Sequence, residues 1–175
     1  MGIEVKNVDP RVKRTRKLLQ QAFMELLQEK DFAGISILDI TERATVNRAT
    51  FYAHFTDKYA LMDSIIREQF QQVTASMLPA VPGWGEASLR LLVRATFEFL
   101  RELHNYCKPS ETSFNLLAER AVQQELVQVI QGWLKQVKGL TMQQRAMQET
   151  IASAMGWTIF GIAGEWSHNG QEPSI

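Results

Sequence analysis

Residues 47–54 of this 175-residue chain read NRATFYAH, a run dense in side chains that can hydrogen-bond to nucleic acid. The guanidinium of Arg48 can bond both acceptors of a guanine edge, and Thr50 can contact the methyl group of thymine. Tyr52 and His54 carry polar groups that can reach phosphate oxygens. Apolar Phe51 lies among them, so the run predicts a short amphipathic helix with its polar edge outside. Such an edge has the groups needed to touch duplex DNA.

A second short helix is predicted just before this run. Ser36 stands three residues before Asp39, which is the spacing of a capping box at a helix start. Thr45 and Val46 interrupt the apolar pattern, and Asn47, a preferred N-cap residue, restarts it. Two short helices joined by a tight turn form a helix-turn-helix, whose second helix enters the major groove.

Basic residues precede both helices. Five of the seven residues from 11 to 17 are basic, namely Arg11, Lys13, Arg14, Arg16 and Lys17. They suit the phosphate backbone or a minor groove, although a basic run alone is usually a solvated helix face. Residues 1–60 hold 10 Lys and Arg against 8 Asp and Glu, a net charge of +2, and the remainder holds 9 against 11. The asymmetry favours DNA contact by the N-terminal part.

Residues from about 11 to 66 resemble the TetR family of bacterial one-component regulators. The matching motifs are the basic first helix, Ser36 at the start of the second helix, and NRATFYAHF followed by Thr56, Asp57 and Lys58. The resemblance implies that Arg48 and Thr50 contact bases, and that Ser36, Tyr52, His54 and Lys58 contact phosphates. The complete set of expected DNA-contacting residues is Lys13, Arg14, Ser36, Asn47, Arg48, Ala49, Thr50, Tyr52, His54 and Lys58.

Two positions depart from the family pattern. The family usually has Gly in the turn, where this chain has Thr45, for which a left-handed backbone is strained. A slightly remodelled turn is therefore expected. Many members carry Arg where this chain has Leu38, which can offer only a methyl contact or packing. Base readout is expected to depend more heavily on Arg48.

The rest of the chain shows helical periodicity without strand-like alternation. Helices are predicted over about 11–29, 57–78, 86–106, 113–117, 119–137 and 141–166. The expected fold is all-α and TetR-like, with an N-terminal three-helix helix-turn-helix DNA-binding domain and a C-terminal helical ligand-binding and dimerisation domain. We place the first domain at 1–60, ordered from about residue 11, and the second at 61–175.

The last predicted helix, around IASAMGWTIFGIAGEW, is rich in small residues that allow close helix approach. Each glycine costs about 1 kcal/mol inside a helix, which favours a packing reason for several of them. We expect a two-fold dimer seam there, formed by Ala152, Gly156, Phe160, Gly161 and Gly164. A membrane span is disfavoured, because the uncharged stretch 150–164 is shorter than the roughly 20 residues a bilayer requires. The resemblance implies a four-helix interface from 119–137 and 141–166 and a palindromic operator in double-stranded DNA.

A ligand pocket is the least defined expectation. The resemblance implies that a small apolar or amphipathic molecule enters the second domain and releases a repressor from DNA. Apolar side chains that could line such a cavity are Phe97, Leu103, Tyr106, Phe114, Leu117, Trp133 and Met155. Residues of these types are more often plain core, so a regulator without an inducer pocket stays open as an alternative.

An enzyme is disfavoured. The chain has three His and a single Cys, Cys107, with no metal-ligand spacing, and it has no phosphate-binding glycine loop or nucleophile elbow. No cofactor and no metal are expected. The lone cysteine and the polar N-terminus are consistent with the cytoplasm. A helical protein-interaction module that has lost DNA binding is the remaining alternative.

Overall fold

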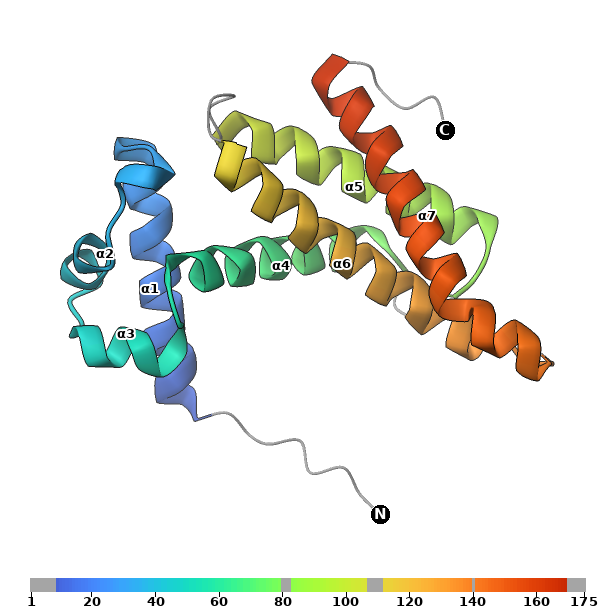
Figure 1. Ribbon diagram of the computed structural model, residues 1–175, viewed down its shortest axis with the longest axis horizontal. Helices are drawn as coiled ribbons and strands as arrows, with labels where there is room; N and C mark the ends of the chain where they lie inside the picture. Colours follow the sequence, from blue (N-terminus) through green and yellow to red (C-terminus); the bar gives the residue numbers. More distant parts are fainter. Residues whose placement is uncertain (1–8, 80–82, 107–111, 140, 170–175) are drawn as a thin grey trace. The chain divides into compact units, whose positions relative to one another are not determined.

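The computed structural model describes residues 9–79, 83–106, 112–139 and 141–169, and their side chains except those of 104–106, 112–115, 168 and 169. Every regular element within these ranges is a helix (Figure 1), which confirms the predicted all-α class. The chain divides into two compact units, Met1–Ile65 and Ile66–Ile175.

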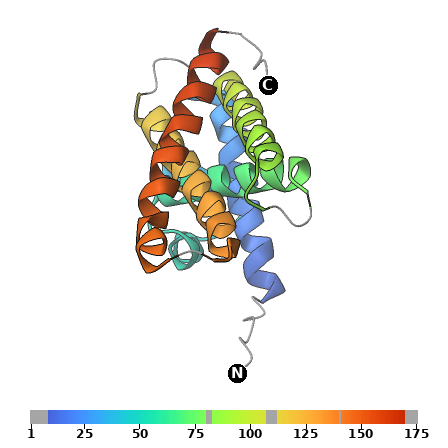
Figure 2. The same ribbon diagram turned by 90° about the vertical axis from the view of Figure 1, so that its right-hand side faces the viewer.

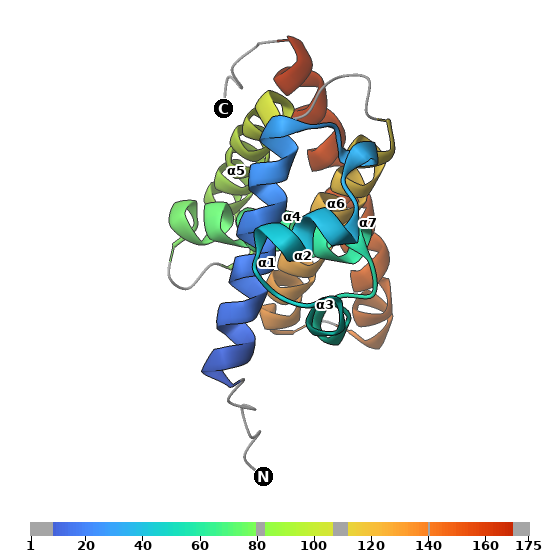
Figure 3. The same cartoon turned by 90° about the vertical axis from the view of Figure 1, so that its left-hand side faces the viewer.

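The first unit is built from three helices, a short 3-10 turn and the start of a fourth helix. They are α1 (Pro10–Glu29), η1 (Phe32–Gly34), α2 (Ile37–Arg43), α3 (Arg48–His54) and the first residues of α4 (Lys58–Met77). Asp9 starts α1, because its Oδ1 accepts the N–H of Arg11 at 2.8 Å, and Pro10 fits a first helical turn. Figure 3 shows α2 lying across α1, with α3 following it.

Packing, not length, holds α2 and α3 in place. Each has seven residues, too few for a stable isolated helix. Their inward side chains Ile40 and Phe51 are fully buried, as is Leu19 on α1. Phe23 and Phe32 meet edge to face with ring centroids 6.0 Å apart, so the 3-10 turn joins the same core.

The second unit contains three long helices as well as the later part of α4. They are α5 (Glu86–Tyr106), α6 (Thr112–Gln136) and α7 (Met142–Asn169). α7 packs on both α5 and α6, as Figures 1 and 2 show. The sequence-based split into helices at 113–117 and 119–137 is wrong. Ala118, at the expected break, is a strong helix former and is buried, so α6 continues through it.

A buried ion pair connects α4 to α6 within the second unit. Nη1 of Arg67 lies 2.9 Å from Oε1 of Glu125, a residue only 4% exposed. Nε2 of Gln71 donates to the other carboxylate oxygen of Glu125 at 2.8 Å. The buried carboxylate therefore has a cationic partner and a neutral donor, as a charge in a protein core requires.

None of the helices in the described ranges combines the length and apolar character that a bilayer crossing requires. Those same ranges hold no cluster of His, Cys, Asp and Glu suited to a metal ion.

Candidate nucleic-acid interface

The start of α2 is fixed by the predicted capping box. The N–H of Asp39 donates to Oγ of Ser36 at 3.2 Å, and the N–H of Ser36 donates to Oδ2 of Asp39 at 2.7 Å. The Ser36 hydroxyl also donates to Oδ2 at 2.7 Å, and Nζ of Lys30 lies 2.8 Å from the same atom. Hydrogen bonds from Lys30 and Ser36 hold the pKa of Asp39 below its usual range. The Ser36 hydroxyl therefore caps α2, and a DNA phosphate would have to compete with Asp39 for it.

The turn between α2 and α3 keeps the standard geometry in spite of Thr45. This residue has a φ of 55°, the left-handed conformation that glycine adopts easily. The N–H of Val46 donates to the carbonyl of Thr41 at 3.0 Å, and that of Thr45 donates to Glu42 at 3.1 Å. These two bonds form a Schellman motif. The expected remodelling of the turn is therefore absent, and Thr45 carries the strain instead.

α3 is capped by Asn47, as predicted. Oδ1 of Asn47 accepts the N–H of Thr50 at 2.7 Å and the Thr50 hydroxyl at 2.9 Å. A base contact by the Thr50 hydroxyl must therefore compete with this cap, whereas the Thr50 methyl group remains available for a thymine.

The outer edge of α3 is solvent-exposed at its first two residues and in its middle. Arg48 and Ala49 are exposed, and Tyr52 retains 52% exposure. Phe51 on the opposite face is fully buried, and the ring of Tyr52 meets it edge to face at 5.6 Å. His54, in the last turn, is half-buried. The outer edge of α3 thus faces solvent, while its apolar side packs in the core and holds the helix in place.

The basic part of α1 lies beside the end of α3. The guanidinium of Arg16 stacks over the ring of Phe55 at 4.7 Å, and Phe55 immediately follows α3. Lys13 and Arg14, one turn earlier, are exposed. The first unit therefore exposes the cationic side chains of Lys13 and Arg14 as well as the outer edge of α3.

A charged clamp that sequence reasoning missed joins α1 to α2. Arg43 donates from Nη1 and Nη2 to the two carboxylate oxygens of Glu29, at 2.9 and 2.8 Å, and Glu25 lies 3.6 Å away. This bidentate pairing lowers the pKa of Glu29 and raises that of Arg43. The available signal was the i, i+4 placement of Glu25 and Glu29 on α1, which puts both carboxylates on one face.

Lys58 has a different environment from the one expected. Its ammonium donates to the carbonyls of Phe32, Ala33 and Ile35, so it faces the turn between α1 and α2. Lys58 is expected to contact DNA, but its ammonium is hydrogen-bonded to these three backbone carbonyls.

The predicted ligand-pocket residues differ in burial. Phe97 and Trp133 are buried core, while Leu103, Leu117 and Met155 are half-buried. The side chains of Tyr106 and Phe114 lie outside the described set.

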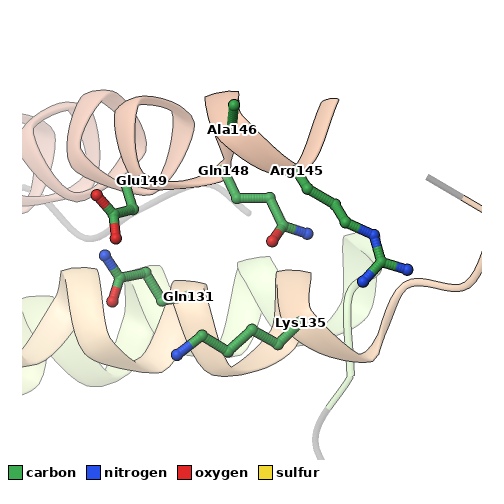
Figure 4. Close-up of a pocket in the computed structure, with 6 residues that line it drawn as sticks. All are labelled: Gln131, Lys135, Arg145, Ala146, Gln148 and Glu149. Atoms are coloured by element: carbon green, nitrogen blue, oxygen red, sulfur yellow. The ribbon is translucent and has the colours of Figure 1, made fainter. Parts of the chain in front are cut away.

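Two hollows lie between α6 and α7. One has a volume of about 320 Å³, and Figure 4 shows its polar lining, in which Gln131 and Glu149 face each other from the two helices. The other, of about 360 Å³, is lined by Gln123, Gln124, Val127, Gln128, Ser153 and Trp157. Neither includes a residue from the predicted pocket.

The residues expected at the dimer seam separate into two groups. Ala152 and Gly156 are buried inside the protomer, and a methyl group on Gly156 would lie 2.9 Å from Cγ2 of Val127 on α6. These two assignments are corrected, because residues that pack on their own chain are not available to another copy. Gly161 is exposed and Phe160 and Gly164 are half-buried, with open space at both glycines.

Part of the first unit matches a known protein family. Residues 19–65 match the family model described as bacterial regulatory proteins, tetR family. The HTH-type transcriptional regulator YxbF of Bacillus subtilis (strain 168) is 45% identical over 69 residues, covering 39% of this chain and 18% of that protein. YdeS of the same organism, also an HTH-type transcriptional regulator by name, is 33% identical over 87 residues, covering 50% and 41%. The chain spans less than half the length of these relatives.

Two solved structures share the fold over most of the chain. A transcriptional regulator from Pseudomonas aeruginosa PAO1 has a TM-score of 0.54 and 18% identity, covering 97% of this chain and 86% of that one. The dihydroxyacetone kinase operon activator DhaS has a TM-score of 0.52 and 21% identity, covering 90% and 86%. At these identities the likeness shows the fold alone.

Proposed function

Because residues 19–65 match the TetR family model, we propose that this chain is a TetR-family, sequence-specific DNA-binding regulator of transcription. The single observation that carries the proposal is the exposed edge of α3, where Arg48, Ala49 and Tyr52 stand outward from a helix that buried Phe51 anchors. A polar edge fixed by a rigid core suits direct reading of bases in the major groove. In bacteria such a regulator acts in the cytoplasm, on chromosomal DNA.

The residues divide by role. Arg48 reads a base pair, most readily guanine, and Ala49 and the Thr50 methyl group contact thymine. Tyr52, His54, Lys13 and Arg14 bond phosphates and fix the register on the duplex. Asn47 and Ser36 hold the helix starts, as their capping bonds indicate.

The regulator acts as a homodimer on a palindromic operator. In support, α7 carries no charged residue from 150 to 164, and its exposed side presents Ile151, Trp157 at 64% exposure and Ile162. A helix that is apolar on its outer side as well as its buried side has a second surface to cover. We place the seam on this side, with Gly161, Phe160 and Gly164.

Repression relieved by a small ligand is our working model of regulation. The proposed lining consists of the half-buried residues Leu103, Leu117 and Met155, the buried residues Phe97 and Trp133, and Tyr106 and Phe114. A ligand acts by binding one of two conformations more tightly. One relative in fold, DhaS, is named an activator, so the sign of regulation needs its own test in a reporter strain.

The test compares Arg48→Ala with Lys13→Ala on specific and random duplexes at fixed salt. Arg48→Ala should cost about 1–3 kcal/mol on the specific site and little on random sequence, because it removes a base contact. Lys13→Ala should weaken both duplexes alike. Equal losses for Arg48→Ala on both duplexes would remove its reading role, and salt-insensitive binding of a protein partner without DNA binding would favour the interaction-module alternative.

A further inference from the structure

The ammonium of Lys58, the first residue of α4, sits at the end of the 3-10 turn η1. Nζ donates to the carbonyl oxygens of Phe32 at 2.9 Å, Ala33 at 3.2 Å and Ile35 at 2.8 Å. An ammonium has three N–H groups, so three carbonyls match its donors in number. The Phe32 carbonyl also accepts the N–H of Ile35 at 3.2 Å. A cation placed at the end of a helical turn bonds its last carbonyls and complements their dipoles.

Two aromatic rings also lie close to the Lys58 ammonium. Nζ of Lys58 lies 4.6 Å from the ring centroid of Phe32 and 5.8 Å from that of Tyr59. The two rings meet edge to face at 5.2 Å, and Phe32 is 3% exposed. The cation is thus held by ring faces as well as by carbonyls.

The location of these carbonyls gives them a role in DNA reading. Ile35 is the residue before Ser36, which caps α2, and Ile35 is 1% exposed. A bond from α4 to the carbonyl of Ile35 therefore fixes the point at which α2 begins. Because α2 packs on α3, the same bond affects the orientation of the reading edge.

We propose that Lys58 is a positioning residue, which ties the turn between α1 and α2 to the start of α4, and that it does not donate its charge to a DNA phosphate. Its effect on DNA reading rests on the proposed function, whereas its effect on the fold does not. To reach a phosphate, the ammonium would have to leave the carbonyls of the buried residues Phe32 and Ile35 without this donor, which a native structure avoids.

Lys58→Met and Lys13→Met in the full chain form a matched pair, because both remove one ammonium and keep an unbranched stem. Thermal unfolding is followed by circular dichroism, and binding to a random-sequence duplex is measured over a salt series well below both midpoints. Lys58→Met should lower the unfolding midpoint by about 3–10 °C and leave the slope of log K against log salt unchanged. Lys13→Met, at an exposed site, should leave the midpoint unchanged and make the slope shallower by about 0.9.

A second variant keeps the charge. A planar guanidinium cannot direct three N–H groups at carbonyls arranged around an ammonium, but it can serve a phosphate equally well. Lys58→Arg should therefore lower the midpoint, whereas a phosphate contact predicts wild-type stability and slope.

An unchanged midpoint in Lys58→Met, a slope made shallower to the extent seen in Lys13→Met, or wild-type behaviour of Lys58→Arg would each overturn the proposal. If the wild-type protein fails to bind duplex DNA, the proposed function fails, but the two midpoint measurements still decide whether Lys58 holds the turn.

Discussion

At Gly156, α7 lies close to α6, and replacing this residue by Ala tests that packing. The added methyl group would lie 2.9 Å from Cγ2 of Val127, with the Val127 N at 3.6 Å and the carbonyl oxygen of Gln123 at 3.8 Å. Val has essentially one side-chain rotamer in a helix, so relief requires the helices to separate. Overpacking of this kind costs about 1–3 kcal/mol. Ala regains about 1 kcal/mol of helix propensity, so the net loss of stability is about 1 kcal/mol.

In a chain of this length, 1 kcal/mol corresponds to a midpoint shift of about 2–4 °C. Thermal unfolding followed by circular dichroism should therefore show Gly156→Ala about 2–4 °C below wild type. The matched control is Gly132→Ala in α6, where a methyl group meets nothing within 4 Å. It should gain about 1 kcal/mol from helix propensity alone and melt 2–4 °C higher. If both variants shift upward together, the close approach of α7 to α6 at Gly156 is refuted.

Three further substitutions address the turn, the α2 cap and the seam. Thr45→Gly should stabilise the chain by about 0.5–1 kcal/mol by chemical denaturation, because left-handed strain outweighs the flexibility that glycine adds; a lower midpoint would contradict it. The pKa of Asp39 lies below its ordinary 3.8 in the fold, so its ionised form stabilises the fold above that pH and the benefit is lost in stronger acid. The difference in melting midpoint between wild type and Asp39→Asn should therefore be full at neutral pH and shrink below about pH 4, and a constant difference would refute the cause. Gly161→Leu should yield folded monomers by sedimentation, because the protomer has open space at Gly161 and the added side chain would clash only with a second copy. An intact dimer would show that the seam lies elsewhere.

Local features of the first unit could be predicted from the sequence. The capping pairs Ser36 with Asp39 and Asn47 with Thr50 span three residues, so side-chain chemistry and spacing suffice to place them. The exposed edge of α3 followed from a residue period that places Phe51 inside.

Contacts between residues distant in sequence could not be predicted in this way. The partners of Lys58 lie 23 to 26 residues away, and nothing in the local pattern distinguishes a lysine that bonds carbonyls from one that bonds phosphate. The sequence also does not determine which side of α7 is buried, because residues 150–164 place small and apolar side chains on every side of this helix. The pattern therefore predicts a seam at Ala152 and Gly156, although Ala152 is buried within its own protomer and Gly156 packs on α6.

The central claim is that the edge of α3 reads DNA sequence, and selection of bound duplexes from a random pool tests it most directly. The account predicts an enriched palindrome, with half-sites separated by about one helical turn, that the Arg48→Ala protein binds with relaxed preference at one position in each half. Recovery of no preferred sequence, or of a palindrome read unchanged by Arg48→Ala, would contradict it.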